Sequence, residues 1–184
     1  MSFKLVVACI AMGLCLTAGV AFAQDDPIGK VDTVSLYVET IADGKWMVSA
    51  HVWNDEELAA IDIPLKYTAG IAKIFVDSVV FKGTRIEGFA LKSSQVDTVK
   101  QIMDVGGIAF MDPVKPPLPV GKGEVARIFL SAKGEKKPGA FAIDTTAYPP
   151  NSSLMLVDVN AKTIVPALKI EYKKAAAAPP AKKQ

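Results

Sequence analysis

The sequence has little of what most catalytic and metal sites require. Its only cysteines, Cys9 and Cys15, lie in the apolar N-terminal segment, and His51 is the only histidine. A structural zinc site combines several cysteine or histidine ligands, so the composition excludes one. No serine occupies a Gly-flanked strand-to-helix elbow that could act with the single imidazole. We therefore expect a protein that is not an enzyme and that carries no cofactor.

The first 23 residues have the pattern of a secretory signal peptide. Lys4 supplies the basic start, residues 5–20 form an almost unbroken apolar run, and Ala21-Phe22-Ala23 offers small residues where a signal peptidase cleaves. The run is short for a membrane span of about 20 residues, and polar residues follow it instead of a basic flank. We expect a mature chain that begins at Gln24, has no transmembrane segment, and is secreted to the periplasm or the extracellular space.

Basic residues are concentrated near the C-terminus. The whole sequence has 21 basic and 19 acidic residues, a formal net charge of +2. Without Lys4 and the four lysines of residues 173–184, 16 basic residues stand against 19 acidic ones, a net charge of −3. A nucleic-acid binder needs a basic folded surface, so we expect no nucleic-acid partner. The Ala/Pro/Lys composition of residues 173–184 predicts a disordered tail.

Residues 24–172 form a single predicted domain of short β-strands. Apolar and polar residues alternate over 33–39, 46–53 and 61–67, and Asp43-Gly44 separates the first two runs. This alternation is typical of strands with one buried and one solvent-exposed face. The further predicted strands are Ile74–Phe81, Val96–Asp104, Ile108–Met111, Glu124–Ser131, Ala140–Thr145, Leu154–Val159 and Thr163–Ile170.

The number and spacing of these strands predict an all-β fold. About eight to ten short strands with no helix between them favour an antiparallel two-sheet jelly-roll sandwich. Pro64 interrupts the third strand, so we expect that strand to lie at an edge or to carry a bulge there. The four prolines of segment 111–123 predict a stiff loop, which is either a contact platform or a plain connection.

Four residues on the polar phase of the first two strands are candidates for ligand binding. They are Tyr37, Met47, His51 and Trp53. An exposed Trp53 can stack on a sugar ring or anchor a protein interface. If Trp53 instead turns into the core at the end of its strand, this surface has no function.

Acidic segments give no clear metal site. Asp55, Glu56 and Glu57 follow a strand and have the pattern of a solvated turn. Asp158-Val159-Asn160 begins like an EF-hand loop, but Lys169 occupies position twelve, where a glutamate is required. We therefore predict no metal ligands and keep a calcium site as the less favoured alternative.

The order of several segments resembles cohesin-like domains of bacterial surface proteins. The early match is a valine-rich strand at 48–52, a turn at 54–58 and an apolar strand at 61–67 that ends in an aromatic residue. The later matches are 77–85, the glycine-led strand 123–130, and segments 143–146, 156–158 and 164–166. This resemblance spans residues 31–170 and implies a nine-stranded jelly-roll sandwich, which several cellulose-binding modules share.

The resemblance also implies a function, as a non-catalytic exported module. Such a module engages a protein partner, dockerin-like or another surface component, through one sheet face and its loops. In true cohesins the partner is a calcium-loaded dockerin, but no dockerin-contacting residue can be matched in this sequence. The alternative is a carbohydrate-binding module for extracellular polysaccharide, which would need two or three coplanar exposed aromatics. A structural unit that polymerises through an edge strand is a further alternative.

Overall fold

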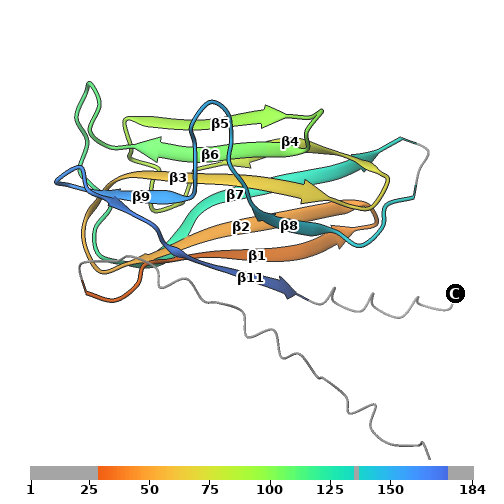
Figure 1. Ribbon diagram of the computed structural model, residues 1–184, viewed down its shortest axis with the longest axis horizontal. Helices are drawn as coiled ribbons and strands as arrows, with labels where there is room; N and C mark the ends of the chain where they lie inside the picture. Colours follow the sequence, from red (N-terminus) through yellow and green to blue (C-terminus); the bar gives the residue numbers. More distant parts are fainter. Residues whose placement is uncertain (1–28, 135–136, 174–184) are drawn as a thin grey trace, which may run out of the picture.

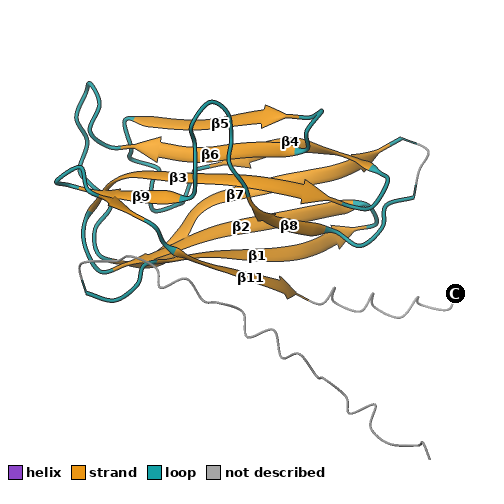
Figure 2. Cartoon of the chain, in the orientation of Figure 1, coloured by secondary structure: helices purple, strands orange, loops and turns teal. Residues whose placement is uncertain are grey.

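The computed structural model describes residues 29–134 and 137–173, which form a sandwich of two β-sheets (Figures 1 and 2). The predicted signal peptide and, apart from Lys173, the predicted tail lie outside the described residues. Lys173 is instead the last residue of a strand. Within the described ranges, no helix is long and apolar enough to cross a membrane.

Sheet A contains the two strands on which the candidate residues lie. Its strand order is β11-β1-β2-β7-β4. The strands are β1 (Thr33–Ala42), β2 (Lys45–Asn54), β4 (Lys73–Val80), β7 (Gly121–Lys133) and β11 (Ala167–Lys173). Neighbouring strands of this sheet are antiparallel, except that β1 and β11 run parallel.

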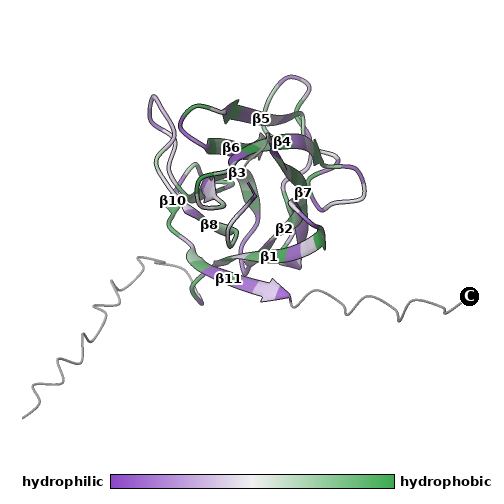
Figure 3. Cartoon of the chain, turned by 90° about the vertical axis from the view of Figure 1, so that its right-hand side faces the viewer, coloured by the Kyte–Doolittle hydropathy of each residue, from purple (hydrophilic) through white to green (hydrophobic). Residues whose placement is uncertain are grey.

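Sheet B covers the other side of the core, with the strand order β10-β9-β3-β6-β5. The strands are β3 (Leu58–Thr68), β5 (Leu91–Asp97), β6 (Ile102–Ile108), β9 (Met155–Asp158) and β10 (Thr163–Ile164). A further strand, β8 (Ala142–Thr145), pairs with the second half of β3. Figure 3 shows the two sheets as separate layers, because the strands are seen nearly end-on in that view.

The core forms where the apolar phases of the two sheets meet. Leu36 and Val48 of sheet A and Ile63 and Leu65 of sheet B are fully buried. Removing such alternating apolar side chains from water is the main force that holds the sheets face to face. The predicted all-β, two-sheet jelly-roll sandwich is therefore confirmed.

Three predicted strand boundaries are wrong. The segment Val96–Asp104 spans the end of β5, a turn and the start of β6. In this turn Gln101 has a φ of 57°, and Asp97 Oδ1 accepts backbone N–H groups at 2.9 and 3.0 Å. The expected strand Ile108–Met111 contributes only its first residue, the last of β6. The segment Thr163–Ile170 divides before Ala167 into β10 and β11, which belong to different sheets.

Pro64 does not mark an edge strand. β3 lies inside sheet B, with β6 on one side and with β9 and then β8 on the other. The pairing with β9 ends at Asp62 and that with β8 begins at Leu65, so Pro64 lies where the partner strand changes. The missing N–H of a proline breaks no pairing at such a junction. The carbonyl oxygen of Pro64 accepts hydrogen bonds from the Thr145 hydroxyl at the end of β8 and from the backbone N–H of Thr146.

Arg85 fastens one end of the sandwich. Its Nη1 donates to the carbonyl oxygens of Val52 and Gly121, at 3.0 and 3.1 Å, and to Asn54 Oδ1 at 2.9 Å. Its Nη2 donates to the carbonyl oxygen of Pro119. Burial lowers the pKa of Arg85, but a guanidinium remains charged at any physiological pH. This one side chain therefore joins β2, β7 and the proline-rich loop.

Candidate functional site

The four candidate ligand-binding residues all lie on the outer face of sheet A. Met47, His51 and Trp53 alternate with buried residues along β2, and Tyr37 lies on the neighbouring strand β1. All four side chains are half-buried, so Trp53 does not turn into the core. His51 and Trp53 are neighbours on this face, whereas Met47 lies about 13 Å from His51 along the strand. The structure therefore brings three of the four together.

The Tyr37 and His51 rings do not form a flat platform. They meet edge to face, with centroids 4.9 Å apart and ring planes at 83°. Partial burial lowers the pKa of His51; Glu124 opposes this effect, while Lys122 and other cations add to it. The imidazole is therefore neutral at pH 7. This pair offers no coplanar surface for stacking on a polysaccharide.

The outer face of sheet B carries an exposed apolar patch around a shallow hollow of about 200 Å³. Leu91 of β5 and Ile108 of β6 are opposite each other in register, and their side chains are 41% and 37% exposed. Met155 and Val157 of β9 are half-buried and line the same hollow. Gly106 also lines it, where a Cβ would come within 2.6 Å of a backbone oxygen of β3. We call this surface the sheet B patch: Leu91, Gly106, Ile108, Met155 and Val157.

Two carboxyl groups border the sheet B patch. The Ser152 hydroxyl, on the loop between β8 and β9, lies 2.5 Å from Asp62 Oδ2 and 3.0 Å from Asp104 Oδ2. Partial burial, with the hydrogen bond and charge of Asp62, raises the pKa of Asp104 to about 7. Asp104 therefore takes up a proton near neutral pH, because burial and the neighbouring Asp62 disfavour its charged form. With Asp104 protonated, the single Ser152 proton is donated to Asp62.

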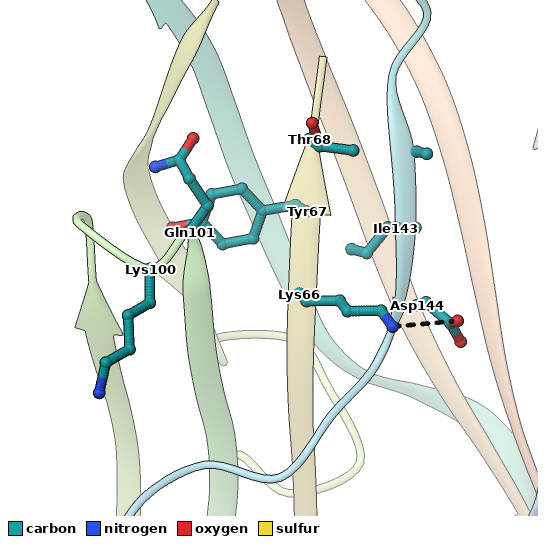
Figure 4. Close-up of a pocket in the computed structure, with 8 residues that line it drawn as sticks. Lys66, Tyr67, Thr68, Lys100, Gln101, Ile143 and Asp144 are labelled. Carbon is teal, nitrogen blue, oxygen red and sulfur yellow. Dashed lines mark ion pairs between the residues drawn. The ribbon is translucent and has the colours of Figure 1, made fainter. Parts of the chain in front are cut away.

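A larger hollow, of about 530 Å³, lies where β3, β8 and the β5–β6 turn meet (Figure 4). Lys66 at its rim pairs with Asp144 at 3.7 Å, and Lys100 pairs with Asp97 at the same distance. Desolvation, followed by the charge of Asp97, raises the pKa of the buried Tyr67 to about 12, so its phenol keeps its proton. Since both cations of this hollow are already paired with carboxylates, we assign no ligand to it.

Three acidic residues meet near the start of β1. Asp32, Asp55 and Glu56 each place a carboxylate oxygen within 4.8 Å of the others, an arrangement that a hard cation such as Ca²⁺ could use. The sequence prediction included two of these residues and missed Asp32. Backbone N–H groups of Lys30 and Asp55 donate to this cluster, so hydrogen bonds account for much of it, and we assign no ion. Asp158, from the EF-hand-like segment, accepts two backbone N–H groups of its own turn.

Sequence reasoning misses the sheet B patch. Leu91 lies in a segment that is not predicted as a strand, and Ile108 is assigned to the start of a strand that does not form. The available signal is the pair Gly106-Gly107 directly before Ile108, because glycines inside a strand mark a close approach or a gap between side chains. The patch forms only because four strands pair side by side, and this pairing cannot be predicted from the order of residues in the sequence.

Comparison with known proteins identifies the fold. No protein-family model and no curated protein matches this chain. Its structure is similar to the OlpA cohesin of Clostridium thermocellum, solved in a type I complex with a dockerin. The two share 14% identity at a TM-score of 0.59, over 78% of this chain and 100% of that one.

Two further solved cohesins give the same result. The third ScaC cohesin of Acetivibrio cellulolyticus, solved with the ScaB dockerin, is 13% identical at a TM-score of 0.58, over 79% of this chain and 99% of that one. The solution structure of CaCohA2 from Clostridium acetobutylicum is 16% identical at a TM-score of 0.53, over 83% and 96%. This chain therefore has a cohesin-like β-sandwich fold, as its sequence resemblance indicated.

Proposed function

We propose that this protein is an exported, non-catalytic module that docks a protein partner on the outer face of sheet B. The observation that carries the proposal is the sheet B patch, in which exposed apolar side chains surround a hollow and carboxyl groups border it. An apolar centre with a polar rim is the usual anatomy of a protein interface. Contiguous exposed apolar surface with polar groups around it commonly marks an interaction site.

A dockerin-like partner fits this surface. The cohesins similar to this chain include two that were solved in complex with dockerins, which supports a partner of that kind. The space beside Gly106 accepts one projecting apolar side chain from the partner. A hydroxyl or basic group next to that side chain would reach the Asp62 carboxylate at the rim. Any calcium required would be held by the partner.

The carboxyl pair supports binding over catalysis. Glycoside hydrolysis uses two carboxyl groups about 5 to 9.5 Å apart, with the sugar or a water between them. Here Asp62 and Asp104 both contact the hydroxyl of Ser152, which occupies the place that a reacting water would need. The pair therefore holds the loop between β8 and β9 against the sheet.

Export and chain organisation complete the proposal. Residues 1–23 act as a signal peptide, 24–173 form the docking domain, and 174–184 form an Ala/Pro/Lys tail. The apolar run followed by Ala21-Phe22-Ala23 supports cleavage before Gln24. The module then works in the periplasm or in the extracellular space.

A pulldown with two matched variants tests the docking proposal. The bait is the full-length protein, offered the exported proteins of its own cell with and without calcium. Ile108→Lys places a charge on the sheet B patch, and Met47→Lys places the same charge on the outer face of sheet A. We expect a calcium-dependent partner that the wild type and Met47→Lys retain and that Ile108→Lys loses. Equal retention by both variants would exclude the sheet B patch as the docking surface.

A further inference from the structure

A third hollow, of about 300 Å³, lies on the outer face of sheet A around Trp53. Its other functional groups come from β1, β7, β11 and the residues before β1. They are Lys30, Thr33, Ser35, Lys122 and Lys169. This volume is at the lower end of the range for small-molecule sites, which suits a ligand about the size of a sugar unit.

The strand register sets the arrangement around the indole. Trp53 is paired with Thr33 on one side and with Lys122 on the other. Ser35 follows on the same face of β1, and its partner on β11 is Lys169. One side of the Trp53 ring therefore has a cation, and the other has two hydroxyl groups with a second cation beyond them.

The third cation enters from the segment before β1. The backbone N–H of Lys30 donates to Asp55 Oδ2 at 2.7 Å, which fixes the start of this segment against the turn after β2. Its side chain lines the same hollow as Trp53. The hollow therefore collects lysines from three separate parts of the chain.

These three lysines are exposed, and none of them forms an ion pair among the described residues, although the charge of Lys30 acts on nearby Asp55. Within the described residues, no carboxylate lies within 4 Å of an ammonium group of Lys30, Lys122 or Lys169, whereas Lys66, Lys100 and Lys133 each pair with an aspartate. The nearest glutamate along β7, Glu124, is bound to Arg127 through two hydrogen bonds. Lys122 and Lys169 therefore make the hollow positive in a chain body that is negative overall.

We propose that this hollow binds an anionic sugar, one whose ring carries a carboxylate or a sulfate. Trp53 stacks on the apolar face of the ring, and the lysines attract the acidic group. The half-buried Thr33 hydroxyl provides a hydrogen bond to a sugar hydroxyl, while Ser35, which is only 7% exposed, lines the hollow. A site for a neutral polysaccharide binds by stacking several aromatic rings on the sugar. Here a single stacking ring is enough, because the lysine charges supply the additional attraction for an acidic sugar. The site is independent of the docking surface, since it lies on the other sheet.

Tryptophan fluorescence of the full-length protein measures binding directly. The chain has two tryptophans, and Trp46 is 5% exposed and stacked on Phe141 at 4.7 Å, so a change on ligand addition reports on Trp53. The probes are tetragalacturonate, a sulfated chondroitin tetrasaccharide, and neutral cellotetraose. We expect a saturable fluorescence change with one or both acidic probes and no change with the neutral probe. The comparison of the two acidic probes separates carboxylate recognition from sulfate recognition. Binding should weaken when salt shortens the Debye length from about 14 to about 4 Å.

Variants test the roles of the Trp53 ring and of the lysine charge. Because Trp53→Ala removes the fluorescent indole, their binding is measured by gel retardation, with polygalacturonate or chondroitin sulfate in the gel, according to which acid binds the wild type. Trp53→Ala should weaken binding about tenfold, the loss of roughly 1.4 kcal/mol of stacking. Lys122→Gln should weaken it about threefold, and Lys66→Gln, with the same charge change on sheet B, should leave it unchanged. The proposal would be overturned if Trp53→Ala bound the acidic sugar as tightly as the wild type, or if Lys66→Gln weakened binding as much as Lys122→Gln. It would also be overturned if polyglutamate bound as tightly as the acidic sugar, or if neither acidic sugar bound.

Discussion

Ser152 and Asp62, which are 90 residues apart in the sequence, are joined by a hydrogen bond of 2.5 Å on the outer face of sheet B. The bond ties the loop between β8 and β9 to the central strand β3. Asp104 joins the same hydroxyl from β6 at 3.0 Å. The rim of the proposed docking surface therefore depends on the protonation of Asp104.

Replacing Asp104 should change how stability depends on pH. Its pKa is about 7 in the folded protein, against about 3.9 in an unfolded chain. The folded state holds this proton more tightly, so the stabilisation is complete below pH 4 and is lost as the pH rises through 7. Allowing for solvent screening, we expect a loss of about 1–2 kcal/mol in unfolding free energy from this group between pH 4 and 8. Asp104→Asn cannot ionise and should lack this loss.

Thermal or urea unfolding at several pH values between 4 and 8 measures the difference. Titrating groups away from Asp104 and its neighbour Asp62 contribute equally to both proteins, so the difference between the two curves reports on Asp104 in contact with Asp62. Parallel curves for the wild type and Asp104→Asn would show that this carboxyl group does not titrate near neutral pH.

Removing the Ser152 hydroxyl should shift the same titration. The hydrogen bond from Ser152 lowers the pKa of Asp104, in opposition to burial and the effect of Asp62. In Ser152→Ala we expect this pKa to rise above its wild-type value, because the carboxylate form loses a donor. The pH dependence of the Asp104 side-chain carbon shift in NMR spectra reports the change. A pKa that stays the same or falls would contradict the hydrogen-bond geometry.

Loss of the Arg85 guanidinium should destabilise the fold strongly. Arg85→Met leaves the carbonyl oxygens of Val52, Pro119 and Gly121 without this donor, and we expect a cost of about 2–4 kcal/mol. The matched control is Arg127→Met, which removes a single pair with Glu124 within one strand and should cost about 1 kcal/mol or less. Urea unfolding measures both variants, and equal costs would contradict a fastening role for Arg85.

A methyl group at Gly106 should be harder to accommodate than one at Gly88. A Cβ at Gly106 would lie 2.6 Å from the Ile61 carbonyl oxygen, whereas a Cβ at Gly88 meets nothing within 4 Å. We expect Gly106→Ala to lower the unfolding free energy by about 1–3 kcal/mol, because the strand backbone must move. Gly88→Ala should stay within about 0.5 kcal/mol of the wild type in the same urea titration. Equal stability of the two variants would contradict the close approach of the β3 backbone to Gly106.

The sequence predicts the strands that bury one face and misses those that do not. Alternation locates β1, β2 and β3, because each directs apolar side chains to the core and polar ones to solvent. β5 is an edge strand with polar residues on both faces, so no alternation marks it. The β5–β6 turn uses Asp97 and Gln101 instead of glycine or proline, so two short strands are read as one.

The candidate sites differ in the same way. Trp53 and His51 can be found from the sequence, since one strand carries both at a spacing of two. Their cationic neighbours cannot be found, because Lys122 and Lys169 reach the same hollow only through pairing with β2 and β1. The sheet B patch depends even more on tertiary pairing, as its members come from strands that are far apart in the chain.

Site-specific photo-crosslinking tests the central claim most directly. A photoreactive phenylalanine derivative replaces Ile108 on sheet B in one variant and Met47 on sheet A in the other. Each is illuminated with the calcium-dependent partner that the wild type captures. If the partner docks on sheet B, the variant labelled at position 108 gives a covalent adduct and the variant labelled at 47 gives none. An adduct from position 47 alone would place the docking surface on sheet A and contradict the account.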